Sequence, residues 1–156
     1  MREMRDDYVN VASHWRGVFV VSTPETSEVF ETSEVWKATM EIGETIYVTT
    51  RAEFREWLEK NHKFRKEIWL IQYKKFTQKP SIAYADAVEE AICFGWIDGL
   101  EKGIDDQSFA KRFMRRIPKS NWTEANMERA RNMIMEGKMT EAGRALLPKE
   151  IQRFKG

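Results

Sequence analysis

The sequence predicts an α+β domain in which an antiparallel sheet of short strands is packed by helices. Amphipathic helical stripes, such as Val88, Ala91 and Ile92, are interspersed with short β-branched and aromatic runs. Two extended segments, residues 96–104 and 108–116, flank the turn sequence Asp-Asp-Gln and predict a β-hairpin. A length of 156 residues with 42% hydrophobic side chains is typical of one compact domain.

Residues 1–41 differ in composition from the rest, because they contain no leucine and include a Ser/Thr/Glu-rich run from Ser22. We favour a poorly ordered extension, of the kind that an upstream start codon would add before Met40. The alternative is an added strand at residues 18–21 that pairs with the domain. We therefore divide the chain into an extension, residues 1–41, and a single domain, residues 42–156.

The sequence of the first half of the domain predicts a strand, a helix and a second strand. Residues 46–48 are β-branched and aromatic, and the capping box from Thr50 to Glu53 begins a helix that ends near Asn61. Residues 67–76 carry apolar side chains at both odd and even positions. That pattern predicts an inner strand covered on both faces.

The second half begins with the clearest helix, residues 84–94, which Gly95 is expected to end in the left-handed region. Its acidic residues are expected to face water. The hairpin follows, and then Thr123 is the predicted N-cap of a helix that runs to about Glu136. Pro148 is expected to open a last amphipathic turn.

Composition excludes several classes of protein. A net charge of +1 argues against a general polyanion binder. Cys93 is the only cysteine and the two histidines are far apart, so we expect no disulfide, no metal site and no cofactor. Weak iron binding by the acidic helix face, through Asp86, Glu89 and Glu90, is the alternative to a solvated face.

Targeting signals are also missing from the sequence. No apolar run approaches the roughly 20 residues needed to span a bilayer, and no apolar stretch follows the charged N-terminus as a signal peptide would require. Together with the single cysteine, these features predict a cytoplasmic protein with no membrane span.

A set of short motifs between Tyr47 and Gly143 resembles the YdeI/OmpD-associated family, also labelled bacteriocin-protection proteins. The most specific is Cys-Phe-Gly-Trp-Ile-Asp-Gly at residues 93–99. The others include Phe-Arg-Glu-Trp-Leu at 54–58, Lys-Pro-Ser at 79–81, Ala-Val-Glu-Glu-Ala at 87–91, Ser-Asn-Trp-Thr at 120–123 and Gly-Lys-Met-Thr at 137–140.

The resemblance implies an α+β domain allied to the YjbR/CyaY-like folds and a role in tolerance to peptide antibiotics or stress. It implies no particular reaction. The chain departs from the family pattern in its N-terminal segment and in ending at Gly156, where members usually continue into a helical, Lys/Arg-rich segment. If that segment carries the function, this chain is expected to lack it.

The candidate site is a basic strand beside two tryptophans. In an extended strand, Arg112 and Arg116 share one face about 13 Å apart, with Lys119 and Trp122 close in sequence. Guanidinium groups bind carboxylate or phosphate, so these residues predict an anion-binding pocket with an aromatic wall. In the alternative, Arg112 and Arg115 pair with acids of the hairpin, namely Asp98, Glu101, Asp105 or Asp106.

The predicted ligand-binding residues are Trp96, Asp98, Arg112, Arg115, Arg116, Trp122 and Asn126. Asp98 is a candidate general acid or base, or it orients an arginine. Asn126 either helps the start of its helix to bind an anion or only caps that helix.

Three hypotheses follow from these residues. The first is a binding protein for a small anionic or peptide ligand. The second is a nucleic-acid-binding protein that uses the basic stretch at residues 111–119, which predicts a steep salt dependence. The third is an enzyme that uses Asp98.

Overall fold

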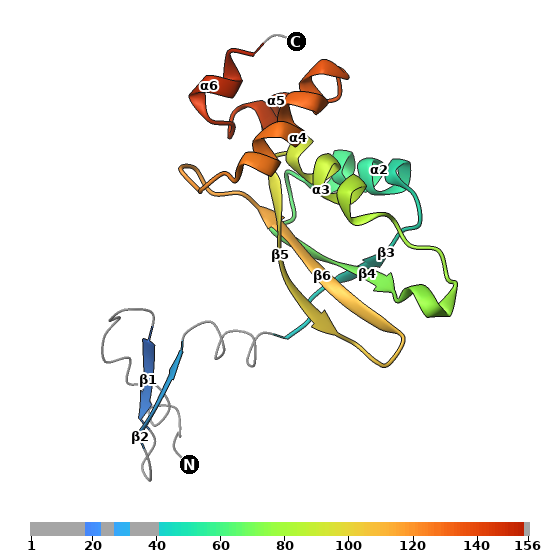
Figure 1. The fold of residues 1–156 in the computed structure, drawn as a ribbon, viewed down its shortest axis with the longest axis vertical. Coiled ribbons are helices and arrows are strands. Elements are labelled where there is room, and N and C mark those ends of the chain that lie inside the picture. The colour runs from blue at the N-terminus through green and yellow to red at the C-terminus, as the bar shows by residue number, and fades with distance from the viewer. Residues whose placement is uncertain (1–17, 23–26, 32–40, 155–156) are drawn as a thin grey trace. The chain divides into compact units, whose positions relative to one another are not determined.

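The computed structural model describes residues 18–22, 27–31 and 41–154. The chain forms two compact units, Met1–Glu41 and Ile42–Gly156. In the first, β1 (Val18–Ser22) pairs antiparallel with β2 (Ser27–Glu31) (Figure 1). The strand at residues 18–21, which was the alternative to a poorly ordered extension, is present, but its partner in this two-stranded sheet is β2 rather than a strand of the domain. The expected poor order of the extension concerns residues 1–17, 23–26 and 32–40, which lie outside the described residues.

The second unit is built on a four-stranded sheet with the order β3-β4-β6-β5 (Figure 1). Its strands are β3 (Thr45–Tyr47), β4 (Glu67–Tyr73), β5 (Trp96–Gly103) and β6 (Ser108–Arg115). The α+β class is confirmed, and β4, β6 and β5 pair antiparallel as expected. However, β3 is parallel to β4, so the sheet is mixed rather than wholly antiparallel. The reason is helix α2 (Arg51–Asn61), which connects the two strands as a crossover.

The helices begin and end at the predicted signals. At the start of α2, the Thr50 hydroxyl accepts from the Glu53 N–H at 3.3 Å, and a Glu53 carboxylate oxygen accepts from the Thr50 N–H at 3.1 Å. Helix α3 (Tyr84–Cys93) is followed by Gly95 at φ +75°. Thr123 caps α4 (Glu124–Met135). The short helices α5 (Glu141–Arg144) and α6 (Lys149–Gln152) follow.

The predicted second strand is shorter than expected, because β4 ends at Tyr73 and a single 3₁₀ turn (Lys75–Thr77) follows it. β4 is nevertheless the inner strand that its apolar pattern predicts. Ile68 of β4 lies opposite Phe113 of β6 in the sheet register, and both are fully buried in the core with Phe54 and Leu58 of α2. Helices α4 to α6 gather near the end of the sheet where β5 begins and β6 ends (Figure 1).

The acidic face of α3 does not face water throughout, and this corrects the prediction. Glu90 is only 1% exposed, and it accepts from Arg51 Nε at 2.5 Å and from Arg55 Nη1 at 2.7 Å. Arg51 also binds Asp86 at 3.2 Å and Glu89 at 2.8 Å. The carboxylates are therefore engaged by α2, which packs against α3 and presents two arginines to it.

Two kinds of feature are absent from the described residues. No group of three or more His, Cys, Asp or Glu side chains there is arranged to hold a metal ion. No helix in the same part of the chain is both long and apolar enough to cross a membrane.

Candidate functional site

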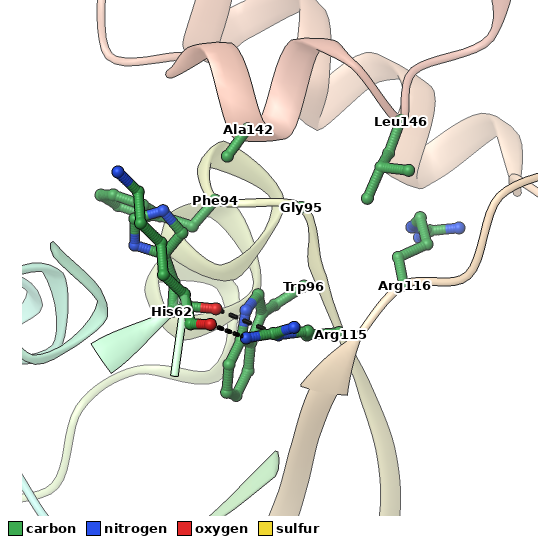
Figure 2. Close-up of a pocket in the computed structure, with 9 residues that line it drawn as sticks. His62, Phe94, Gly95, Trp96, Arg115, Arg116, Ala142 and Leu146 are labelled. Carbon is green, nitrogen blue, oxygen red and sulfur yellow. Dashed lines mark hydrogen bonds between the residues drawn. The ribbon is translucent and has the colours of Figure 1, made fainter. Parts of the chain in front are cut away.

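A hollow of about 350 Å³ lies at the end of the sheet where β5 begins and β6 ends (Figure 2). Four segments contribute its walls: the end of α2, the turn from α3 into β5, the end of β6, and the region of α5. The lining residues are His62, Lys63, Phe94, Gly95, Trp96, Arg115, Arg116, Ala142 and Leu146.

Gly95 allows these segments to approach one another. A Cβ atom at this position would lie 2.9 Å from the Ala142 carbonyl oxygen and 2.9 Å from Leu146 Cδ1. Its φ of +75° is also one that side-chain-bearing residues rarely adopt. The glycine predicted to end α3 therefore also permits the wall of the hollow that Ala142 and Leu146 form.

Two of the predicted site residues, Arg112 and Arg115, already bind other parts of the protein. Each uses the edge of its guanidinium group that carries Nε and Nη2. Arg112 donates from Nε to Glu67 Oε2 at 3.1 Å, and its Nη2 donates to the same oxygen. Arg115 donates from Nε to the His62 carbonyl oxygen at 3.1 Å and from Nη2 to that of Lys63 (Figure 2). Glu67 lies on β4, and His62 and Lys63 follow α2. The alternative considered from the sequence instead paired these arginines with acidic residues of the β-hairpin.

Arg116 differs from Arg112 and Arg115, because its guanidinium is buried and some of its N–H groups have no hydrogen-bond partner. The residue is 5% exposed. Nη1 donates to Ser120 Oγ at 3.1 Å and to the Asn121 carbonyl oxygen at 3.0 Å, and the guanidinium lies 3.7 Å from the Trp122 ring centroid. Nε and Nη2 are buried and have no hydrogen-bond partner. We call these two N–H groups, which share one edge of the guanidinium, the Arg116 fork.

The electrostatics of Arg116 reflect this burial. Burial lowers its pKa, and the negative charge of Asp98 acts in the opposite direction. Arginine nevertheless stays protonated in proteins. Among the described residues, no carboxylate lies within ion-pair distance of Arg116. A buried positive charge without a counter-ion is costly unless something else compensates it.

The other predicted site residues contribute less to the hollow. Trp96 lines it but is only 1% exposed, and its ring meets Trp57 edge to face at 5.8 Å. Asp98 accepts a 2.8 Å hydrogen bond from the Tyr84 hydroxyl and is not among the lining residues. Asn126 donates its backbone N–H to Thr123 Oγ1, and its side chain accepts from Arg129 at 3.2 Å.

Sequence reasoning missed six lining residues, namely His62, Lys63, Phe94, Gly95, Ala142 and Leu146. They come from segments far apart in the chain, and no motif connects them. His62 is held by Nδ1 at 2.8 Å from the Leu58 carbonyl oxygen, and its ring lies 5.1 Å from that of Phe94. Only Gly95 carried a sequence signal, because a glycine that ends a helix predicts a turn between α3 and β5, and this turn lines the hollow.

Cys93, adjacent to the hollow in sequence, is predicted to be unreactive. It is fully buried, and burial, with the negative charge of Glu90 as the next cause, raises its pKa to about 12. At pH 8 roughly one thiol in ten thousand would be ionised, and the thiolate is the reactive form. We expect an aromatic disulfide reagent to label native protein only at the rate of unfolding, and urea-unfolded protein at once. Rapid labelling of native protein would contradict the burial.

The model of a protein family described as "Domain of unknown function (DUF8412)" matches residues 46–146. The chain belongs to this family. The matched span of the DUF8412 domain contains the sheet apart from Thr45, helices α2 to α5 and every residue that lines the hollow. No curated protein and no solved structure matches the chain. The resemblance to the YdeI/OmpD-associated family therefore stays a prediction.

Proposed function

We propose that this DUF8412 domain binds a small anionic ligand, a carboxylate or a phosphate, through the Arg116 fork. One observation carries the proposal: Arg116 is 5% exposed, yet Nε and Nη2 have no hydrogen-bond partner. Buried donors without acceptors cost about 1–3 kcal/mol each, and more when the group is charged. An anion that supplies two oxygens to this edge would remove that cost.

The neighbouring arginines support the choice of an oxygen anion. The equivalent edge of Arg112 holds the carboxylate of Glu67, and that of Arg115 holds two backbone carbonyl oxygens. Guanidinium groups bind carboxylates and phosphates with two parallel hydrogen bonds in this planar geometry. The Arg116 fork has the same planar arrangement of donors, but neither of its nitrogens has an acceptor in the protein.

The side chain of Arg116 is preorganised for binding, because its neighbours hold the guanidinium group in one position. Nη1 is fixed by Ser120 and Asn121, and Trp122 stacks on the guanidinium. Because the fork is buried, a ligand reaches it only when a covering side chain moves. Leu146 lines the hollow together with Arg116, and it follows α5 rather than belonging to the sheet. A side-chain rotation there is compatible with an intact sheet.

The proposal is tested by following arginine Nε–H signals in NMR spectra while acetate or inorganic phosphate is added. We expect the Arg116 signal to shift and saturate, because an acceptor then reaches its unpartnered donor. Replacing Arg116 with glutamine is expected to weaken binding at least tenfold, since about 1.5–3 kcal/mol of charge-assisted hydrogen bonding is lost.

The matched control is Arg131→Gln. It removes the same charge from a more exposed side chain that binds Glu124, and it is expected to leave anion affinity unchanged. Arg116→Lys is a second variant that keeps the charge but loses the fork, and it is also expected to bind weakly. The proposal is wrong if the Arg116 signal does not move, or if the control weakens binding as much as Arg116→Gln.

The other two hypotheses receive less support. Lys111 binds Glu101 at 3.4 Å, and Arg112 and Arg115 have the partners described above, so several cations of the basic stretch are already engaged. Nucleic-acid binding through residues 111–119 would lose affinity steeply with salt. Asp98, the candidate catalytic residue, is bonded to Tyr84. The link to antimicrobial-peptide or stress tolerance derives from the YdeI resemblance alone.

A further inference from the structure

A second hollow, of about 430 Å³, adjoins the first. The two share His62, Lys63, Phe94 and Ala142, and the second adds Glu59, Thr140 and Glu141. Because four residues line both, the hollows are adjacent, and we call the two together the groove. Each hollow lies within the roughly 300–1,000 Å³ range of small-ligand sites.

The two ends of the groove carry opposite charges. Arg115 and Arg116 line the first end, and the second end is lined by two carboxylates, Glu59 and Glu141. Glu59 is 56% exposed and lies 3.3 Å from Arg55. Glu141 is exposed in the first turn of α5. Phe94 and Ala142, which line both hollows, provide an apolar surface between these ends.

From this polarity we infer that the ligand is a short peptide. Its C-terminal carboxylate binds the Arg116 fork, and its terminal ammonium group lies beside Glu59 and Glu141. This inference rests on the proposed function, since the carboxylate is the small anion. A zwitterion matches the charges of both ends, whereas a polyphosphate would meet repulsion from Glu59 and Glu141.

The residues between the two ends are compatible with a peptide backbone. Lys63 lines both hollows, so its ammonium group is a donor for a peptide carbonyl group, while the ring of His62, whose Nδ1 donates to the Leu58 carbonyl oxygen, offers Nε2 as an acceptor. Small apolar side chains would contact Phe94 and Ala142. The groove therefore offers a carboxylate site, a donor, an apolar surface and an ammonium site, which are the groups that complement a short peptide.

The test uses the full chain and isothermal titration calorimetry with dialanine, trialanine and tetra-alanine, compared with acetate. We expect at least one peptide to bind about tenfold more tightly than acetate. Amidation of its C-terminus should abolish binding, because the fork then lacks its anion. Acetylation of its N-terminus should weaken binding about threefold, as expected for loss of an exposed ion pair.

A variant of the acidic end makes the test specific. Glu141→Gln should weaken the free peptide about threefold while leaving the N-acetylated peptide and acetate unchanged. Glu150→Gln, which removes an exposed carboxylate on α6 outside the groove, is the matched control and should change nothing.

The outcomes separate the two proposals. If acetate binds through Arg116 but no peptide binds more tightly, or if N-acetylation has no effect, the peptide inference is overturned and the anion site stands. If neither acetate nor any peptide moves the Arg116 Nε–H signal, both proposals fall.

Discussion

Replacement of Glu90 with alanine is expected to lower the free energy of unfolding by about 3 kcal/mol. Glu90 is 1% exposed and binds Arg51 and Arg55 with its two oxygens. Burial lowers the pKa of Arg51, but Glu90 and Glu89 raise it by more, so its net shift is upward. Both guanidinium groups would lose their buried partner. Each is about one quarter exposed and keeps another acceptor, which limits the loss.

Urea unfolding followed by circular dichroism measures the effect. Glu89→Ala is the matched control, because Glu89 binds the same Arg51 but is 20% exposed, and we expect it to cost about 1 kcal/mol or less. Glu90→Gln preserves the shape and one acceptor oxygen, so it should be intermediate. Equal losses for Glu90→Ala and Glu89→Ala would show that the burial of Glu90 adds nothing.

Gly143→Ala is expected to destabilise the domain by about 3 kcal/mol, at the upper end of the range for overpacking. A Cβ atom at Gly143 would lie 2.3 Å from the Cys93 carbonyl oxygen and 2.6 Å from the Ile92 carbonyl oxygen. Both obstacles are backbone at the end of α3 and cannot rotate away. Helix α5 would have to move, and the hydrogen bonds from Thr140 to the Cys93 carbonyl oxygen would be disturbed.

The matched control for this change is Gly103→Ala. A Cβ atom there would meet nothing within 4 Å, and the residue does not have a positive φ. We expect its midpoint in urea to stay within experimental error of the wild type. Because α5 carries Ala142, Gly143→Ala should also weaken acetate binding. An alanine variant as stable as the wild type would contradict the close contact between α5 and α3.

Predictions that depend on a few neighbouring residues were confirmed. Thr50 and Glu53 form both halves of a capping box, and Gly95 has the positive φ expected after α3. Such signals work because the groups involved lie within about four residues of one another, so distant segments have little influence. The helical stripe of α3 likewise identified its buried side correctly at Val88, Ala91 and Ile92.

Predictions that depend on a distant partner were less successful. Glu90 was predicted to face solvent, because a charged residue beside an apolar stripe normally does so. In the structure, α2 supplies two arginines that form ion pairs with the buried Glu90 carboxylate. The parallel pairing of β3 was missed for a related reason. Strand direction follows from the path of the intervening helix, and the composition of a three-residue strand does not encode it.

The sequence by itself determined that arginines and tryptophans gather around β6, because Arg112, Arg115, Arg116 and Trp122 are close in the chain. Only the tertiary structure decided which guanidinium has an Nε/Nη2 edge without an acceptor. Arg112 meets Glu67 from 45 residues away and Arg115 meets the His62 carbonyl from 53, whereas Arg116 is buried against Trp122 with its fork unpartnered. The reason is physical: an arginine's neighbours in sequence set its position on a strand, but acceptors brought by other segments determine what it binds.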